Sequence, residues 1–435
     1  MKRILFIISL LLIITFSTGC NQLLTEERIL SNDQWLEDIE YLNEKLTKYH
    51  PDIFKFISEE EWSESINNLK LEVPQLSDTS IKLRISQIIA SIGDAHTSML
   101  PSELLSSIPS PILKGENPTD IKGILEFPIK CEYFDDGLRV IECDSKYKEI
   151  LGSKIVSINN TDINKIINDI GTLFSHDYKN EQKSSKYANI YLNIYDFLKF
   201  FNIVDSKKAE YEFEFNDEER IVLTLRASES KDINYISKDK KEMKTNKIQA
   251  GESDFYWFRN FEEDNILYLK FNKFIHKTKG EPDFYKFQEE LLKEINNKNY
   301  SKFIIDLRNN GGGSITVLNA MIDMIKYQTD LKGEEIYIIT GKETNSASVG
   351  LAWNLQSKIG ATVVGEITGG NINLFSTNSS QIELPNSKLK PLYSTKFKNN
   401  KEGYNGGVKP DIEIIQDYKD YINGIDTCYE YIKNI

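Results

Sequence analysis

The C-terminal third of this chain alternates short apolar segments with longer amphipathic ones, and this alternation constrains the fold more than any other feature. The short apolar runs predict strands at residues 266–271, 303–307, 336–340 and 362–365. Between them, apolar residues recur on one helical face and predict helices at 284–295, 315–325 and 346–355. Strands that alternate with helices form a largely parallel sheet covered by helices. The sequence therefore predicts a layered α/β domain.

Two junctions at the ends of these strands carry residues suited to catalysis. After one strand the chain reads Asp306-Leu-Arg-Asn-Asn-Gly-Gly-Gly313, and after the next it reads Asn345-Ser-Ala-Ser348 at the start of a helix. Open α/β sheets bind ligands beyond the carboxyl ends of their strands, where both junctions lie. Acyl transfer needs a nucleophile and donors for an oxyanion, which a hydroxyl and glycine amides supply.

Each junction also has a plainer interpretation. Ser346 is either a nucleophile or an N-cap residue, and Ser348 is a second hydroxyl in the same turn. The glycines at 311–313 either expose amides to an oxyanion or form a tight turn. A phosphate loop has little support, because no Lys-Ser or Lys-Thr pair follows the glycines. Asp306 and Arg308 are expected to brace the loop and not to act on substrate.

Residues 31–92 predict three helices that end next to a histidine. Capping boxes begin the first two helices, at Ser31 and at Ser58, and Gly93 suits the C′ position of the third. The chain continues as Asp94-Ala-His-Thr97. A histidine titrates near neutrality and would serve as the base for a serine nucleophile, although a lone histidine is more often structural. His96 is thus the candidate base.

The region 109–230 predicts a β-rich module. Its expected strands are 124–129, 138–142, 155–158, 209–215 and 221–225, and a helix is expected at 190–201. A turn signal at Asp135-Asp-Gly137 separates Cys131 from Cys143. These two cysteines either form a disulfide across two strands or remain two buried thiols.

Charge and the N-terminus limit the partners and the location. A formal net charge of −13 leaves no basic surplus for nucleic acid. Lys2-Arg3, an apolar run over 4–16 and Ser17-Thr-Gly-Cys20 predict a bacterial lipoprotein signal with a lipidated Cys20. Ordinary signal cleavage that leaves a free Cys20 is the alternative. No Cys/His spacing indicates a metal site.

Five ordered motifs resemble those of the S41 peptidases, the carboxyl-terminal processing protease and tricorn-core group. They are Ile92-Gly-Asp-Ala-His-Thr97, Asp306-Leu-Arg-Asn-Asn-Gly-Gly-Gly313, Asn345-Ser-Ala-Ser348, Val363-Val-Gly-Glu-Ile-Thr-Gly369 and Gly407-Val-Lys-Pro-Asp411. The resemblance covers about residues 35–415 and implies a ClpP/crotonase-like catalytic domain. The segment 151–160 is similar to the strand and turn of a PDZ module, which the family usually carries.

The resemblance also implies the site residues. Ser346 would be the nucleophile, His96 its base, and the amides of Gly312 and Ala347 the oxyanion donors. Glu402 or Asp94 would orient His96. Two positions depart from the family. Asn371 stands where Ser-Lys processing proteases have lysine, and Ala95 stands where the tricorn-like branch has serine.

The expected protein is therefore a membrane-anchored, extracytoplasmic serine peptidase that acts on peptides or proteins, with no cofactor. The expected division of the chain is a signal peptide at 1–19, a tether at 20–30, an N-terminal helical domain at 31–108, a PDZ-like β-rich region at 109–230, a linker or mobile loop at 231–254 and a catalytic domain at 255–435. An inactive peptide-binding lipoprotein on the same fold is the alternative. A crotonase-type acyl-CoA enzyme is a third interpretation, disfavoured by export. The sequence does not fix the oligomeric state.

Overall fold

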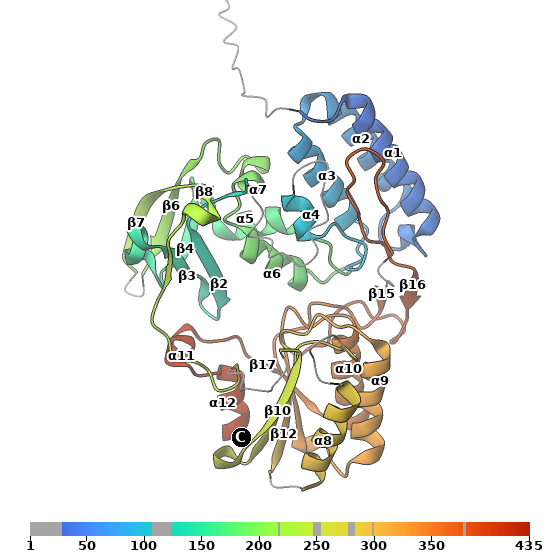
Figure 1. The fold of residues 1–435 in the computed structure, drawn as a ribbon, viewed down its shortest axis with the longest axis vertical. Helices are drawn as coiled ribbons and strands as arrows, with labels where there is room; N and C mark the ends of the chain where they lie inside the picture. Colours follow the sequence, from blue (N-terminus) through green and yellow to red (C-terminus); the bar gives the residue numbers. More distant parts are fainter. Residues whose placement is uncertain are drawn as a thin grey trace, which may run out of the picture.

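A computed structural model describes residues 28–106, 123–215, 218–246, 254–276, 283–297, 300–376 and 380–435 (Figure 1). The predicted signal segment and Cys20 lie outside these ranges. None of the helices in the described ranges is both long enough and apolar enough to cross a bilayer.

The N-terminal helices form as the sequence predicts. They are α1 (Asn32–Tyr49), α2 (Glu59–Glu72), α3 (Asp78–Ala90) and the short α4 (Pro101–Leu105). Both capping boxes are present, since the side chains of Ser31 and Ser58 each accept from the amide three residues on, and their own amides donate to the side chains of Gln34 and Glu61. Gly93 is left-handed at φ +74°, but α3 ends at Ala90 with Ser91 as its C-cap, so Gly93 lies at C″ and not at the predicted C′ position.

The middle region is a seven-stranded, antiparallel sheet with three helices beside it. The strands are β2 (Ile129–Phe134), β3 (Gly137–Asp144), β4 (Lys154–Ile158), β5 (Thr161–Asp162), β6 (Lys208–Glu214), β7 (Arg220–Arg226) and β9 (Tyr235–Ser237), and a separate pair is β1 (Leu125–Glu126) with β8 (Ser228–Glu229). The helices are α5 (Ile163–Gly171), α6 (Gln182–Tyr191) and α7 (Tyr195–Phe200). The predicted 209–225 hairpin is confirmed as β6 and β7.

Two predictions in this region are wrong in detail. The strand at 124–129 is two strands, because Pro128 has no N–H to donate to a ladder. The helix predicted at 190–201 is two helices, α6 and α7, which are separated by a break at Asn193. The Asn193 side chain donates to the carbonyls of Phe127 and Ile129. Across β2 and β3, Cys143 faces Ile129 and not Cys131, and both cysteines are free thiols.

The α/β domain has the predicted parallel order. Its six-stranded sheet runs β10 (Tyr256–Phe261), β11 (Ile266–Phe271), β12 (Lys302–Asp306), β13 (Ile336–Thr340), β14 (Thr362–Gly365) and β17 (Ile412–Glu413), and only the β10–β11 pair is antiparallel. The helices α8 (Phe284–Asn297), α9 (Ile315–Asp323) and α10 (Ala347–Ile359) cover one face. Beyond β17 lie α11 (Tyr418–Asn423) and α12 (Thr427–Asn434), and α12 packs on the other face.

An arm of the α/β domain reaches the N-terminal helices (Figure 1). It is residues 380–395, between β15 (Leu374–Ser376) and β16 (Lys396–Lys398). Ile382, Leu384 and Leu389 lie in the same apolar core as the N-terminal helices. The fully buried Asp38 of α1 accepts from two backbone amides of the arm, each at 2.8 Å. The arm therefore fixes the N-terminal helices to the α/β domain.

Candidate active site

Ser346 occupies the N-cap position of α10 without acting as a cap. Its backbone is at φ 56° and ψ −118°, a region that serine rarely adopts, and its side chain makes no capping hydrogen bond. Strain of this kind persists only where the surroundings impose it, and it is common at active sites. A half-buried hydroxyl on a strained strand-to-helix turn is the arrangement of a nucleophile elbow.

Ser348 has the structural role that Ser346 lacks. Its Oγ donates toward the carbonyls of Asn310 and Asn345, both at 2.6 Å, and accepts from the Asn345 amide at 2.8 Å. The side chain is fully buried. Ser348 therefore ties the serine turn to the glycine loop, and its hydroxyl is not available to a substrate.

The glycine loop lies directly against the serine turn. A Cβ on Gly312, whose φ is +101°, would lie 2.6 Å from the Ser346 Cβ and 3.0 Å from the Ala347 nitrogen, so only glycine fits. The Gly312 N–H donates to Asn310 Oδ1 at 2.8 Å. The Ala347 N–H, at the first helical position, has no acceptor among the described residues. Of the two predicted oxyanion donors, Ala347 is therefore free and Gly312 already has a partner.

Asp306 and Arg308 brace the strand end, as predicted. The buried Asp306 carboxylate accepts from Tyr268, Lys270 and Arg308 at 2.5–2.9 Å. Arg308 also donates to Asp426, the N-cap residue of α12. Burial favours a neutral Asp306, but Arg308 and Lys270 hold its pKa well below the ordinary value.

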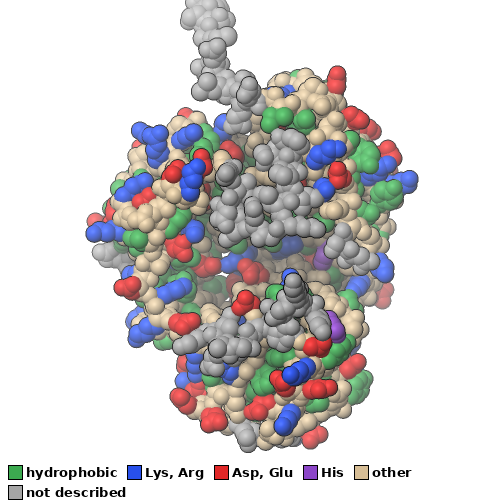
Figure 2. Space-filling model, viewed as in Figure 1, with side chains coloured by type: hydrophobic (Ala, Val, Ile, Leu, Met, Phe, Trp, Pro, Cys, Tyr) green, Lys and Arg blue, Asp and Glu red, His purple; other side chains and the backbone are tan. Residues whose placement is uncertain are grey.

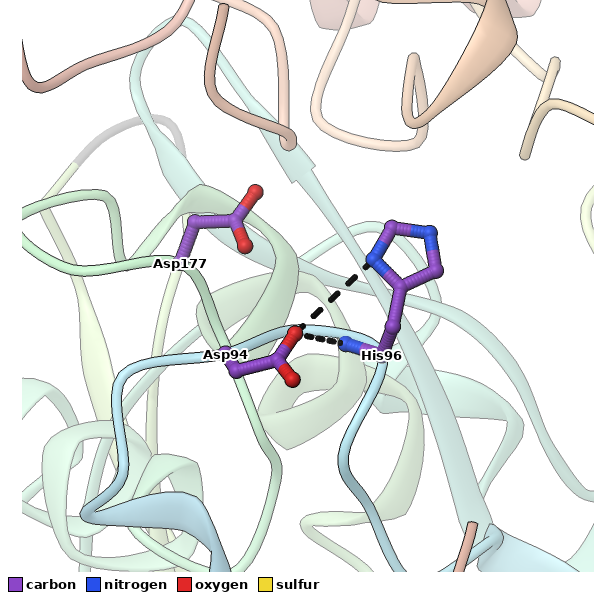
Figure 3. A group of neighbouring side chains, drawn as sticks. All are labelled: Asp94, His96 and Asp177. Carbon is purple, nitrogen blue, oxygen red and sulfur yellow. Dashed lines mark hydrogen bonds and ion pairs between the residues drawn. The ribbon is translucent and has the colours of Figure 1, made fainter. Parts of the chain in front are cut away.

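His96 follows α3 and points toward the α/β domain (Figure 3). Its Nδ1 is buried, lies 4.0 Å from Asp94 Oδ1, and has no hydrogen-bond partner among the described residues. Asp94 is fixed by His50 Nε2 at 3.1 Å, by the Thr97 hydroxyl and by the His96 amide. Burial, aided by Lys183 and Lys398, lowers the His96 pKa to about 4, against the pull of Asp94. His96 is therefore neutral at pH 7, the form that accepts a proton.

Asp177 lies beside Asp94 and His96 and was not predicted from the sequence. It lies between α5 and α6, and its oxygens accept from the amides of Ala95, at 3.1 Å, and Asn371, at 2.8 Å. One bond holds the residue before His96 and the other holds the loop after β14. Burial raises the Asp177 pKa to about 6. An isolated aspartate in a loop gives no sequence signal for such a bridge.

One side-chain oxygen or nitrogen atom from each of Asp94, His96 and Asp177 lies within 4.8 Å of the other two, a spacing that would allow them to share a metal ion (Figure 3). All four carboxylate oxygens already accept hydrogen bonds from amides or side chains. The Lys183 ammonium lies near enough to act on both carboxylates. Occupied oxygens beside a cation fit a positioning network better than a metal centre.

The histidine loop and the serine turn open into one cavity. Its volume is about 470 Å³, and His96 and Ala95 line it together with Asn345 and Gly311. A second cavity of about 310 Å³ is lined by Ser346 and Lys398, and Lys398 is one of the cations that lower the His96 pKa. Figure 2 shows the molecule hollowed between its upper and lower halves, with basic and acidic side chains inside. Residues 96 and 345, about 250 positions apart in the chain, thus line the same cavity, whereas Ser346 itself lines the second one.

Comparison with known proteins decides the family. The profile described as peptidase family S41 matches residues 265–332 and 325–414, which include the glycine loop and the Ser346 turn. Over residues 265–414 the chain belongs to peptidase family S41. It is a serine-type peptidase. No curated protein matches this S41 peptidase in sequence.

Solved structures agree with this fold over nearly the whole chain. Mature CPAF is similar with a TM-score of 0.62 and 11% identity, over 92% of this chain and 96% of that one. CPAF complexed with lactacystin gives a TM-score of 0.59 and 11% identity, over 92% and 98%. At such low identity the likeness establishes a common fold for the S41 peptidase and no more.

The remaining candidates lie apart from His96 or serve the structure. Glu402 is exposed in the turn after β16 and makes no hydrogen bond or ion pair with His96 in the described part of the chain. Asn371, at the position of the family's lysine, accepts from Asn180 at 3.0 Å and donates to the Tyr178 carbonyl at 2.9 Å. In this S41 peptidase Asn371 therefore ties the loop after β14 to the segment before α6.

Proposed function

We propose that this S41 peptidase hydrolyses peptide bonds with Ser346 as nucleophile and His96 as general base. The observation that carries this proposal is the Ser346 hydroxyl, held on a strained turn with no structural bond of its own. Convergence of the His96 loop and the serine turn on one cavity supports the pairing.

His96 takes the Ser346 proton at Nε2 as Oγ attacks the peptide carbonyl. The tetrahedral oxyanion is held by the Ala347 N–H, and by the Gly312 N–H once that group leaves Asn310. His96 then gives its proton to the leaving amine, so an acyl-enzyme forms as the peptide bond breaks. Water, deprotonated by the same imidazole, hydrolyses the ester and restores Ser346.

Asp94 is the carboxylate that we propose orients His96 and stabilises the imidazolium. It is the acidic group 4.0 Å from Nδ1, whereas Glu402 lies exposed in a turn. The gap closes to a hydrogen bond when the charge forms, as apo geometries of catalytic groups often tighten in the complex. We further propose that the α/β domain is ClpP-like, that the middle sheet is a PDZ-like module and that α1–α4 form a domain delivering His96.

A fluorophosphonate tests this function, because an activated serine hydroxyl displaces its fluoride and forms a stable phosphonate ester, whereas an ordinary serine does not react. We expect labelling of the protein at Ser346, mapped by mass spectrometry, and loss of labelling in Ser346→Ala. Ser314→Ala is the matched control, since Ser314 also stands at an N-cap without a capping bond but has an ordinary φ of −67°.

The second candidate function is an inactive peptide-binding protein on the same fold. The occupied Gly312 amide and the unpartnered His96 Nδ1 favour it, because both groups must move before catalysis. A folded protein that stays unlabelled while still binding peptides would establish this alternative.

We also propose that the mature protein is exported and anchored to the membrane by lipid on Cys20. Metabolic labelling with radioactive palmitate in a bacterial host is expected to mark the wild type and not Cys20→Ala, with the variant released to the soluble fraction. Equal labelling of both would contradict a lipidated Cys20.

A further inference from the structure

Lys183, on α6, presents an ammonium to the active-site cavity, and among the described residues no carboxylate forms a direct ion pair with it. Its Nζ donates to the Ala95 carbonyl at 2.9 Å, and it lines the cavity beside His96. Its Cβ packs against the loop after β14, 3.5 Å from where a Cβ on Gly369 would be. An ammonium has three N–H donors, and in the described structure only one has an acceptor.

The carboxylates near Lys183 are committed elsewhere. Burial lowers the pKa of Lys183, and the negative charges of Asp177 and Asp94 oppose this shift. Neither lies within 4.0 Å of Nζ, and both use their oxygens for the bonds described above. Lys183 is therefore held in place without being paired.

Two other lysines on the same cavity wall are paired. Lys186 forms an ion pair with Glu132 at 2.8 Å, and Lys342 forms one with Glu366 at 3.4 Å. The acidic residue of the wall, Glu343, accepts from the Asn309 side chain at 3.3 Å. The lining thus has three cations to one anion, and Lys183 is the cation that has no ion-pair partner among the described residues.

The geometry points to Lys183 as the group that binds a carboxylate of the peptide substrate next to the scissile bond. This inference rests on the proposed function. Because Nζ bonds to the carbonyl directly before His96, the bound carboxylate lies within a residue or two of the reacting carbonyl. An Asp or Glu side chain and a free C-terminal carboxylate share this chemistry.

Three octapeptide pools separate these sources. All three pools have the same degenerate composition except at one central position and at the C-terminus. The first pool has Glu at the central position and an amidated C-terminus, and the second has Gln and an amidated C-terminus. The third pool has Gln and a free C-terminal carboxylate. Binding of fluorescent pools to Ser346→Ala by anisotropy reports the carboxylate site without turnover, and cleavage by the chain with Ser346 intact reports the peptidase.

We expect a carboxylate-bearing pool to bind about tenfold more tightly than the amidated Gln pool, as a charge-assisted bond would give. Lys183→Met should abolish this preference, Lys183→Arg should restore most of it, and Lys186→Met, which removes a paired lysine, should retain it. Preference for the Glu pool identifies a side chain, and preference for the free-terminus pool identifies a terminal carboxylate.

Equal binding of all pools overturns the inference. A loss in Lys183→Met that is equal for every pool also overturns it, because that result assigns Lys183 to support of the Ala95 loop alone. If the preference is present but no pool is cleaved, the carboxylate site stands and the peptidase function fails.

Discussion

Ser346→Ala is expected to lower the rate of peptide hydrolysis by about 10⁴-fold or more while leaving the fold intact. Removing the nucleophile of a serine peptidase typically costs this much, because only oxyanion stabilisation and binding remain. The Ser346 side chain makes no hydrogen bond among the described residues, so its loss breaks no structural contact. Alanine at this position has the same unfavourable positive φ as serine, so the backbone strain does not change. We therefore expect little change in the free energy of unfolding.

Initial rates on an unfolded protein substrate measure the effect, and chemical denaturation verifies the fold. Ser314→Ala should keep wild-type rates. Wild-type activity in Ser346→Ala would refute the assignment. Loss of activity in Ser348→Ala would not, because that variant removes the buried hydroxyl that links the serine turn to the Asn310 carbonyl and is expected to lose about 1 kcal/mol of stability.

For the base, kcat/KM should stay level from pH 8 to about pH 5 and then fall about tenfold per unit below pH 4. The base acts when His96 is neutral, and burial lowers its pKa to about 4. An exposed imidazole, as assumed from the sequence, would instead place the fall near 6.5. His96→Ala should lower activity about 10⁴-fold between pH 5 and pH 8, since no other described imidazole lines this cavity.

Acid stability must be measured alongside the rates. The folded pKa of His96 lies below its ordinary value, so the native state binds fewer protons there and loses stability as pH falls from about 6.5 to about 4. Circular dichroism at each pH separates unfolding from titration of the base. A fall centred near 6 in folded protein would assign the profile to Asp177, whose pKa burial raises to about 6, and not to His96.

Local patterns predicted much of the architecture. The strands β11, β13 and β14 span the residues predicted from their apolar runs, and the capping boxes of α1 and α2 form as predicted. Helix α5 escaped prediction although Ile163, Ile166, Ile167 and Ile170 repeat at helical spacing after the N-cap Asp162. The arm at 380–395 has no such repeat. Its conformation is stabilised by contacts with the N-terminal helices, which a local pattern does not reveal.

The active site divides in the same way. Ser346 and His96 were found from motifs, since each lies in a short run of characteristic neighbours. Asp177 and Lys183 were not, because a charged residue in a loop or on an amphipathic helix is usually solvated and has no local signature. Their roles depend on residues that are distant in sequence, as the Asp177 bonds to Ala95 and Asn371 illustrate.

By itself the sequence determined the α/β domain, the helical caps and the pair of strand-end junctions, because periodicity and capping are local properties of the chain. Only the tertiary structure showed that Ser348 is held by buried hydrogen bonds, that the Ala347 N–H is free while the Gly312 N–H has a partner, and that Lys183 lies beside His96 without an ion-pair partner among the described residues. Those outcomes depend on which polar groups meet on folding. Burial and partner atoms, supplied by segments far apart in the chain, set them.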